Sequence, residues 1–237
     1  MKTAAIVLAA GSGSRMHQKT KKQFMEISGK PLIWYSLNTF ENSPLIDGIV
    51  LVTSKEDIDY CRNEIVNKYS FSKVKKIVAG GKERYHSVNN GLLALELENP
   101  IYVYVHDGAR PFVNEDIIER AYIDVVKYSA CVVGMPVKDT IKIADENGFA
   151  QTTPDRDRTW IVQTPQVFEY PLIKECYSKA IMEEKQLLEK GIHITDDAMC
   201  VEYFSETKVK LTQGAYTNIK VTTPDDIQSA ESILSSI

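Results

Sequence analysis

The residues best suited to chemistry follow the first apolar segment of the chain, in the run LAAGSGSRM at residues 8–16, with Lys22 shortly after it. Glycines and other small residues after a strand let backbone N–H groups approach phosphate oxygens closely, and Arg15 and Lys22 add positive charge. The spacing excludes a Walker A loop, and Met16 stands where a dinucleotide fingerprint needs its third glycine. The run therefore predicts a phosphate-binding loop of another kind; the alternative is a structural glycine turn.

A second candidate group follows another apolar run, in VHDGARPF at residues 105–112. Beside a triphosphate, Asp107 could hold Mg²⁺ or orient a substrate hydroxyl, whereas a lone aspartate at such a place could also cap a loop. In the run GGKERYHSV at residues 80–88, paired glycines permit close approach of a ligand, and Ser87 could bond to a base or a phosphate. Alone, that run would be an ordinary turn between a strand and a helix.

Two cations late in the chain indicate a second anion site. Arg156 lies in a polar stretch, and Lys220 lies within Asn218–Val221, a predicted short apolar strand in which a surface lysine gains nothing. The alternative is a lysine that snorkels from an edge strand. The four histidines lack the spacing of metal ligands, so none is assigned to a metal. Residues 195–197, Thr-Asp-Asp, are interpreted as a helix cap at the threonine with acids in the first turn.

Elements of alternating type must position these residues. Continuous apolar runs are typical of strands buried on both faces, and helical patterns separate them. This order predicts an α/β fold, a mostly parallel sheet with helices on both faces that binds ligands at the carboxyl ends of its strands. The predicted strands are Thr3–Ala9, Gly48–Thr53, Val74–Ala79, Ile101–Val105, Ala130–Met135, Lys208–Thr212 and Asn218–Val221. The predicted helices cover about residues 32–40, 55–68, 86–97, 114–127, 171–184, 196–204 and 224–234.

The alternation breaks in a polar stretch between about Pro136 and Gln166. Asn147-Gly148 within it is a hairpin turn signal, so we interpret the stretch as an excursion from the sheet, either a hairpin arm or a lid. A length of 237 residues favours one domain over two. The predicted organisation is a single domain over residues 1–237 with an arm at about 136–163.

Charge and composition exclude several classes of protein. The chain has 28 Lys+Arg against 32 Asp+Glu, and this net charge of −4 argues against broad binding to nucleic acid or to a membrane surface. Cations nevertheless gather in residues 1–30, which favours a small anion there. No apolar run approaches the ~20 residues that cross a bilayer. The four cysteines are far apart and imply neither a disulfide framework nor a zinc site, so a reducing, cytoplasmic compartment is expected.

Taken together, these motifs resemble the 2-C-methyl-D-erythritol 4-phosphate cytidylyltransferases of the non-mevalonate isoprenoid pathway. The matching blocks occur in order along the chain: LAAGSGSRM, KKQF, GGKERYHSV, VHDGARPF, PVKDTIK, TPDRDRTWIVQTPQVF, ITDDA and NIKVTTPDD. The first block is shared by many sugar-nucleotide transferases, whereas the whole set of blocks in this order is specific to far fewer proteins. The resemblance implies a Rossmann-like fold of the nucleotidyltransferase type with a protruding β-hairpin arm.

The resemblance also implies site residues and partners. CTP would be bound by Ala9, Ala10, Gly11, Gly81, Lys82 and Ser87. The residues implied in catalysis are Arg15 and Lys22 on the triphosphate, with Arg156 and Lys220 on the acceptor. Further acceptor contacts would be Asp107, Arg110, Thr140 and Thr164. Mg²⁺ is expected mainly on the CTP phosphates, with Asp107 as an additional contact. Because the arm crosses a dimer interface in relatives, we expect a homodimer in which Thr140 and Arg156 serve the partner subunit's site.

The chain departs from the family pattern at Gly108, where alanine is common, and at Lys82-Glu83, where relatives often have an acid first. Ribitol-5-phosphate cytidylyltransferase is the alternative: it shares the KQF, TPQ and NIKVTTP blocks but usually has LAGG in place of LAAG. A non-catalytic nucleotide sensor would not need all of the predicted cations, and an NAD(P)-dependent oxidoreductase would need the missing glycine. The expected reaction is direct in-line attack of the acceptor's phosphate on the α-phosphorus of CTP, with release of pyrophosphate.

Overall fold

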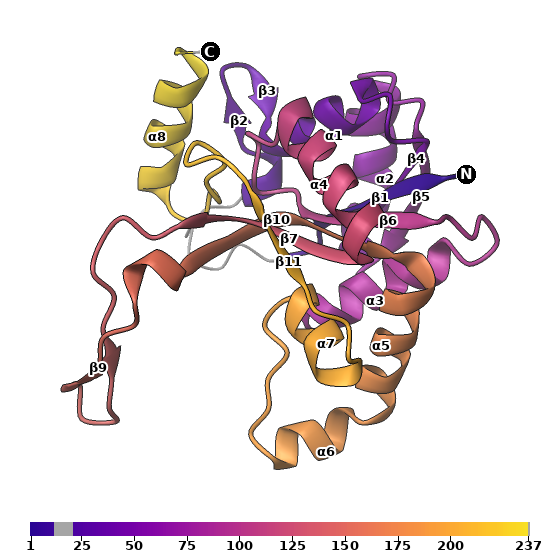
Figure 1. Cartoon of the computed structure of the whole chain (residues 1–237). Helices are drawn as coiled ribbons and strands as arrows, with labels where there is room; N and C mark the ends of the chain where they lie inside the picture. The colour runs from indigo at the N-terminus through magenta and orange to yellow at the C-terminus, as the bar shows by residue number, and fades with distance from the viewer. Residues whose placement is uncertain (12–20, 237) are drawn as a thin grey trace.

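A seven-stranded sheet lies at the centre of the computed structural model, which describes residues 1–11 and 21–236 (Figure 1). The strands lie in the order β11-β7-β10-β6-β1-β4-β5, and among the described strands of this sheet only β10 runs antiparallel to its neighbours. The mostly parallel sheet predicted from the alternating pattern is confirmed. The strands are β1 (Thr3–Ala9), β4 (Gly48–Thr53), β5 (Val74–Ala79), β6 (Tyr102–Asp107), β7 (Ala130–Pro136), β10 (Trp160–Glu169) and β11 (Lys210–Gln213).

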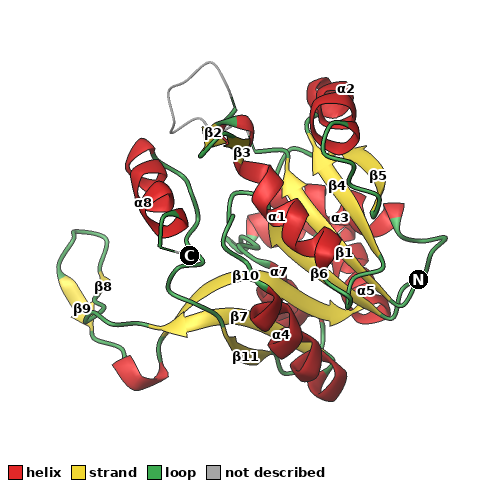
Figure 2. Ribbon diagram, turned by 90° about the horizontal axis from the view of Figure 1, so that it is seen from above, coloured by secondary structure: helices red, strands yellow, loops and turns green. Residues whose placement is uncertain are grey.

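Helices cover both faces of this sheet, because successive side chains of a strand point in opposite directions (Figure 2). Ala5 and Val7 of β1 pack in one apolar cluster with α1 and α4, whereas Ala4 and Ile6 pack in a second cluster with α3, α5 and α7. All four side chains are buried, which explains the continuous apolar run of the first strand. The covering helices are α1 (Leu32–Asn42), α3 (Arg84–Ala94), α4 (Glu115–Tyr128), α5 (Tyr170–Met182) and α7 (Asp197–Phe204).

Most of the remaining elements are short. The helical ones are η2 (Lys22–Phe24), η3 (Lys55–Asp57), α2 (Ile58–Tyr60), the π-helix η4 (Cys61–Asn67), η5 (Arg156–Arg158), α6 (Glu184–Glu189) and α8 (Pro224–Leu234). The strands are β2 (Glu26–Ile27), β3 (Lys30–Pro31), β8 (Ile143–Ala144) and β9 (Ala150–Thr152). The terminal helix α8 begins at the predicted position, Pro224, with Thr223 as its N-cap. Within residues 1–11 and 21–236, no helix combines the length and apolar character needed to cross a membrane.

The polar stretch after β7 contains a strand that sequence analysis did not predict. Strand β10 lies between β6 and β7, with Gln166 opposite Val105 of β6. The interpretation of residues 136–166 as an excursion is therefore wrong for residues 160–166, which belong to β10. Its polar side chains concealed a buried strand: Gln163, Thr164 and Gln166 are all buried, and each has a hydrogen-bond partner from a distant part of the chain.

The rest of that stretch, residues 137–159, does leave the sheet, as predicted. The hairpin of β8 and β9 projects well away from the sheet and its helices, and η5 leads the chain back to β10 (Figure 1). The hairpin turns at the predicted dipeptide: the Asp145 carboxylate accepts hydrogen bonds from the N–H groups of Asn147 and Phe149. Gly148 has a φ of +85°, a left-handed conformation that favours glycine.

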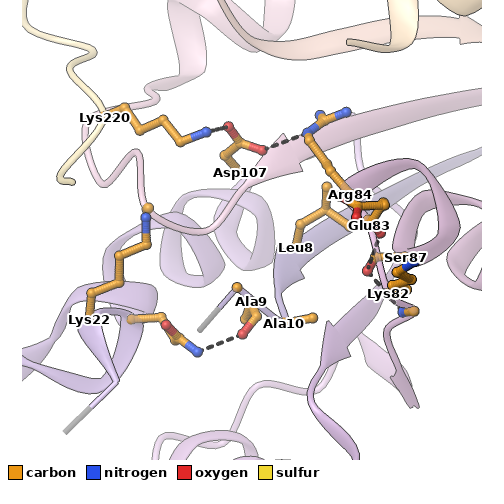
Figure 3. A pocket seen from close by; sticks show the side chains of 14 residues that line it. Leu8, Ala9, Ala10, Lys22, Lys82, Glu83, Arg84, Ser87, Asp107 and Lys220 are labelled. Atoms are coloured by element: carbon orange, nitrogen blue, oxygen red, sulfur yellow. Dashed lines mark hydrogen bonds and ion pairs between the residues drawn. The ribbon is translucent and has the colours of Figure 1, made fainter. Parts of the chain in front are cut away.

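The segment Asn218–Val221 is a loop, so the prediction of a last short strand there is wrong. A single backbone hydrogen bond, from the N–H of Val221 to the carbonyl of Ala109 at 2.8 Å, joins the end of this segment to the loop after β6. The segment is apolar because Ile219 and Val221 pack in a small cluster with side chains of α8. Lys220 lies between these two anchored residues and extends toward the end of β6 (Figure 3).

Candidate functional site

A pocket of about 390 Å³ opens where the carboxyl ends of β1 and β6 meet (Figure 3). The loop after β1, the start of η2, the turn before α3, the end of β6 and the loop after β11 all contribute to it. This is the edge at which the strand order predicts a ligand site. Nine predicted site residues line the pocket: Ala9, Ala10, Gly11, Lys22, Gly81, Lys82, Ser87, Asp107 and Lys220.

The loop after β1 and the short helix η2 form one wall. The side-chain amide of Gln23 donates to the carbonyl of Ala9 at 2.7 Å, and this buried bond fixes η2 against the end of β1. Lys22 begins η2 and extends into the pocket, whereas the neighbouring Lys21 forms an ion pair with Asp57 outside the lining (Figure 3). One cation of this segment is therefore directed at the pocket by the fold itself.

The turn before α3 forms a second wall and approaches the end of β1 closely. A Cβ atom on Gly80 would lie 2.5 Å from the Cβ of Ala10 and 2.7 Å from Oγ of Ser87, so only glycine fits there. The Ser87 hydroxyl accepts a hydrogen bond from the N–H of Gly81 at 3.1 Å and donates to the carbonyl of Glu83 at 3.3 Å. Gly80 is thus required for packing against the end of β1, whereas the close approach of a ligand predicted from the paired glycines stays a prediction.

Asp107 ends β6 and lies between two cations (Figure 3). Nζ of Lys220 is 2.6 Å from Oδ2 of this carboxylate, and Nε of Arg84 is 3.3 Å from Oδ1. Burial alone would raise the pKa of the Asp107 carboxyl, but the charges of Arg84 and Lys220 outweigh it and hold that pKa well below its usual range. Asp107 is therefore ionised at neutral pH and can accept hydrogen bonds from a substrate hydroxyl.

A chain of hydrogen bonds behind the pocket fixes the backbone of Asp107. The Thr164 hydroxyl accepts the N–H of Asp107 at 3.0 Å and lies 3.1 Å from Nδ1 of His106, to which it donates because the proton of the neutral ring is on Nε2. Nε2 of His106 then donates to the carbonyl of Arg110, also at 3.1 Å. Thr164 is buried and does not line the pocket, so it supports the wall in this structure, and its predicted contact with an acceptor stays a prediction.

We expect His106 to make the free energy of unfolding fall as the pH decreases from about 6.5 to about 4. Burial lowers the pKa of His106 from 6.5 to about 4, so in this window the unfolded chain binds a proton that the folded protein does not. Stability therefore rises with pH there, by roughly 3 kcal/mol over the whole window. Urea unfolding at pH 7 and pH 5 checks this in wild type and His106→Gln. The pH effect should shrink in the variant; an equal pH effect in both proteins would contradict the assignment.

Some predicted residues lie away from the pocket. Thr140 and Arg156 are exposed on the arm, and neither contributes to the lining. Their service to a partner subunit's site therefore stays a prediction. Arg15 falls outside the residues that the structure describes, and its role on the triphosphate also stays a prediction.

Arg110 is not in the lining either, although it lies just beyond the end of β6. Its guanidinium donates to the carbonyl of Asn218 at 2.9 Å and to that of Val162 at 3.4 Å. These contacts tie the loop that carries Lys220 to β10 near the root of the arm. In this structure Arg110 therefore supports the site, and its predicted contact with the acceptor remains a prediction.

Arg84 lines the pocket, although sequence analysis assigned it no role. It is the first residue of α3, and its two terminal nitrogens each lie 2.8 Å from a carboxylate oxygen of Asp197. The predicted cap at Thr195 is wrong, because Asp196 caps α7 and Asp197 is its fully buried first residue. Arg84 and Asp197 are 113 positions apart. The only available signal was their opposite charge within two separate motif blocks.

A divalent cation would find few protein ligands at this site. No three Asp, Glu, His or Cys side chains among the described residues are grouped to hold a metal ion. Asp107 and Glu83 bring carboxylates to the lining, and carboxylate oxygens are ligands that Mg²⁺ prefers. Because Asp107 already contacts two cations, the residues fit a Mg²⁺ ion that is held mainly by phosphates of a ligand.

Comparisons with known proteins identify the family of the chain. The chain matches the family model of 2-C-methyl-D-erythritol 4-phosphate cytidylyltransferase over residues 3–236. A relative of that name from Lachnospira eligens is 50% identical over 95% of this chain and 96% of its own, and one from Clostridium kluyveri is 48% identical over 97% and 95%. A crystal structure of 4-diphosphocytidyl-2C-methyl-D-erythritol synthase from Anaerococcus prevotii has a TM-score of 0.84 at 34% identity, covering 99% of this chain and 96% of that one. The chain therefore belongs to the 2-C-methyl-D-erythritol 4-phosphate cytidylyltransferase family.

Proposed function

We propose that this chain transfers the cytidylyl group of CTP to 2-C-methyl-D-erythritol 4-phosphate, giving 4-diphosphocytidyl-2-C-methyl-D-erythritol and pyrophosphate. One observation carries the proposal: a single pocket has the glycine loop and Lys22 on one wall, and the paired Asp107 and Lys220 on another (Figure 3). Two anions can therefore be held together, each beside its own cation. The names of the relatives support the same reaction.

The nucleotide is proposed to bind along the loop after β1 and the turn before α3. Backbone N–H groups of a glycine-rich loop donate to phosphate oxygens, and Lys22 adds a full positive charge beside them. These two segments lie close together, because the turn before α3 packs directly on the end of β1. The proposed CTP contacts in the lining are Ala9, Ala10, Gly11, Gly81, Lys82 and Ser87.

The acceptor is proposed to bind at the end of β6. The Lys220 side chain is 38% exposed, so its ammonium group can contact an incoming phosphate. The adjacent Asp107 carboxylate accepts hydrogen bonds and matches the hydroxyl groups of a polyol. A cation next to a carboxylate is therefore a chemical complement of a polyol phosphate, whose two ends carry a negative charge and hydroxyl donors.

In the proposed step, an oxygen of the acceptor's phosphate forms a bond to the α-phosphorus of CTP. The bond from that phosphorus to the oxygen that bridges it to the β-phosphate breaks, and pyrophosphate leaves. A phosphate monoester has a second pKa of about 6, so the nucleophile is ionised at pH 7 and requires no general base. The chain's own task is to align two anions and neutralise their charge, Lys22 at the transferring phosphorus and Lys220 at the acceptor.

Magnesium is proposed as the cofactor of this reaction. When bound, it neutralises charge on the nucleotide's phosphates. Asp107 is the residue that would contact it, in addition to phosphate oxygens, because its carboxylate is ionised and lies in the lining. Lys22 and Lys220 contribute positive charge of their own to the pocket, so the ion shares the neutralisation of two anions with fixed protein charges.

A homodimer is proposed in which the arm of one subunit reaches the site of the other. Apolar side chains on and beside the arm support this, because they are exposed in a single chain: Ile141, Ile143, Phe149, Ile161 and Val162. Phe149 at the hairpin tip is 72% exposed, an unfavourable position for a phenyl ring unless another surface covers it. If the partner subunit covered this apolar side of the arm, Thr140 and Arg156 on the same arm would lie next to the partner.

Replacing Phe149 with aspartate should shift the protein from dimer to monomer. The change removes apolar area from the interface in both subunits, and two carboxylates would have to lose their hydration there. We therefore expect the dissociation constant of the dimer to increase about 100-fold or more. Sedimentation velocity measures the shift, with Phe149→Leu as the control that keeps an apolar side chain. Acceptor turnover should fall with the dimer fraction. A wild-type protein that sediments as a monomer at all concentrations would contradict the proposed dimer.

The proposed compartment is the cytoplasm, and neither nucleic acid nor a membrane is proposed as a partner. All four cysteines are free and buried, as is usual for thiols in a reducing environment. The net charge of −4 argues against a basic surface for a polyanion, and Lys220 in the pocket is paired with Asp107. Both proposed substrates are small, soluble phosphates.

Release of pyrophosphate tests the proposed function. CTP or UTP is offered with Mg²⁺ and with methylerythritol phosphate, ribitol 5-phosphate or no acceptor. We expect turnover with CTP and methylerythritol phosphate only. Preference for ribitol 5-phosphate would keep the chemistry and replace the acceptor. Measurable binding of CTP without turnover of any pair would overturn the catalytic proposal in favour of a nucleotide sensor.

A further inference from the structure

A buried network outside the pocket holds one of the cations that contact Asp107. The Arg84 guanidinium lies between two carboxylates, and both of its terminal nitrogens bind Asp197 at 2.8 Å. Nε of Arg84 faces Asp107 at 3.3 Å (Figure 3). Asp197 is fully buried, and the Tyr177 hydroxyl donates to its Oδ1 at 2.5 Å. Tyr177 is also fully buried, and neither Asp197 nor Tyr177 lines the pocket.

The start of α7, which carries Asp197, is itself fixed from another side. The Gln166 side chain on β10 accepts the N–H of Ala198 at 2.8 Å and donates to the carboxylate of Asp196 at 3.0 Å. Asp196 in turn caps α7 by accepting the N–H of Met199. Because β10 belongs to the central sheet, the Asp197 carboxylate has a defined place relative to the end of β6.

This arrangement limits the orientation of Arg84. A guanidinium is a planar fork, and a two-point contact with a carboxylate fixes its plane as well as its position. With its two terminal nitrogens bound to Asp197, Arg84 presents the N–H on Nε to Asp107. Oδ1 of Asp107 is thereby occupied, and Oδ2 is left to face Lys220 and the pocket.

The protonation states support the same picture. Burial, together with the charge of Asp197, raises the pKa of the Tyr177 phenol well above its ordinary value, so the hydroxyl keeps its proton and donates. Burial alone would lower the pKa of Arg84, but the charges of Asp197 and Asp107 outweigh it and raise that pKa. The Tyr177 hydroxyl therefore remains a donor and Arg84 remains a cation throughout the neutral range.

We propose that Asp197 and Tyr177 are positioning residues for the acceptor: they orient Arg84, and through it they set the Asp107 carboxylate at the angle that accepts a hydroxyl of the polyol phosphate. This inference rests on the proposed function. A buried ion pair adds little net stability compared with apolar packing of the same volume, so its contribution here is to geometry. The residues that determine acceptor recognition then extend beyond the pocket to α5 and α7.

The test compares two buried tyrosines of α5. Tyr177→Phe removes the bond to Asp197, whereas Tyr170→Phe removes a bond of similar kind, from a buried hydroxyl to the carbonyl of Leu92 at 2.9 Å, that has no link to Arg84. We expect Tyr177→Phe to lower kcat/KM for the acceptor about tenfold, with the CTP dissociation constant within about twofold of wild type. Tyr170→Phe should change the melting temperature comparably and leave both kinetic constants unchanged.

Combination with Asp107→Asn separates positioning from a general loss of structure. If Tyr177 acts through Asp107, adding Tyr177→Phe to Asp107→Asn should cost no further activity, whereas independent effects would multiply. Asp197→Asn is the second variant. It keeps the side-chain shape and should lower kcat/KM for the acceptor about 30-fold, again through the orientation of Arg84. Multiplicative losses, or equal kinetics for the two tyrosine variants, would overturn the positioning role alone. Inactive wild type with every substrate pair would instead overturn the proposed function on which it rests.

Discussion

Replacing Lys220 with alanine is expected to lower kcat/KM for the acceptor by about 100-fold or more while CTP still binds. The Lys220 ammonium is 2.6 Å from Asp107 and partly exposed, so it is the cation on this wall that an incoming phosphate can reach. Without it, the acceptor's phosphate would approach the Asp107 carboxylate with only Arg84 to offset the repulsion. Steady-state kinetics with varied acceptor, together with calorimetric titration of CTP, measure the two effects separately.

Lys220→Arg is the matched variant for this experiment, because it keeps the charge and changes the shape of the donor. It should recover part of the acceptor turnover that alanine loses. A loss of CTP affinity as large as the loss of acceptor turnover in Lys220→Ala would contradict the division of the pocket into two halves.

Replacing Lys22 with alanine is expected to reduce kcat by about 10²–10³-fold, with only a small change in the KM for the acceptor. Lys22 lies on the wall of the glycine loop, where charge grows on the transferring phosphorus and on the leaving pyrophosphate. Its charge is therefore worth more in the transition state than in the bound substrates. Single-turnover kinetics with excess enzyme isolates the chemical step from substrate binding.

The neighbouring lysine provides the control for that prediction. Lys21→Ala makes the same change in net charge one residue away, but Lys21 pairs with Asp57 and does not line the pocket. Its kcat should stay within about fivefold of wild type, because a surface ion pair contributes about 1 kcal/mol or less, which corresponds to about fivefold in rate. Equal losses of kcat in the two variants would mean that the charge of the whole segment, not the placement of Lys22, governs the rate.

The buried parallel strands are the part of the fold that local sequence predicts best. Strands β1 and β4 have the predicted bounds, because a strand covered on both faces must be apolar along its whole length. Strand β10 could not be predicted in this way. Gln163, Thr164 and Gln166 are polar and buried, and their partners come from residues that only the folded chain brings near.

The same distinction applies to the site. A parallel sheet gathers the carboxyl ends of its strands at one edge, so residues such as Ala10 and Asp107 could be placed together from the strand order. The pairing of Arg84 with Asp197 could not, because it joins positions 113 residues apart through side chains alone. Lys220 was placed near the site on the assumption of a strand; the structure reaches the same pocket by a loop anchored at its two apolar neighbours.

The most direct test of the central claim is the fate of heavy oxygen placed in the acceptor's phosphate. The wild-type protein is supplied with CTP, Mg²⁺ and labelled methylerythritol phosphate, and mass spectrometry follows both products. Attack of the acceptor's phosphate on the α-phosphorus of CTP predicts that all the label appears in 4-diphosphocytidyl-2-C-methyl-D-erythritol and none in pyrophosphate. Label in pyrophosphate, or formation of unlabelled CMP in place of the diphosphocytidyl product, would contradict the account.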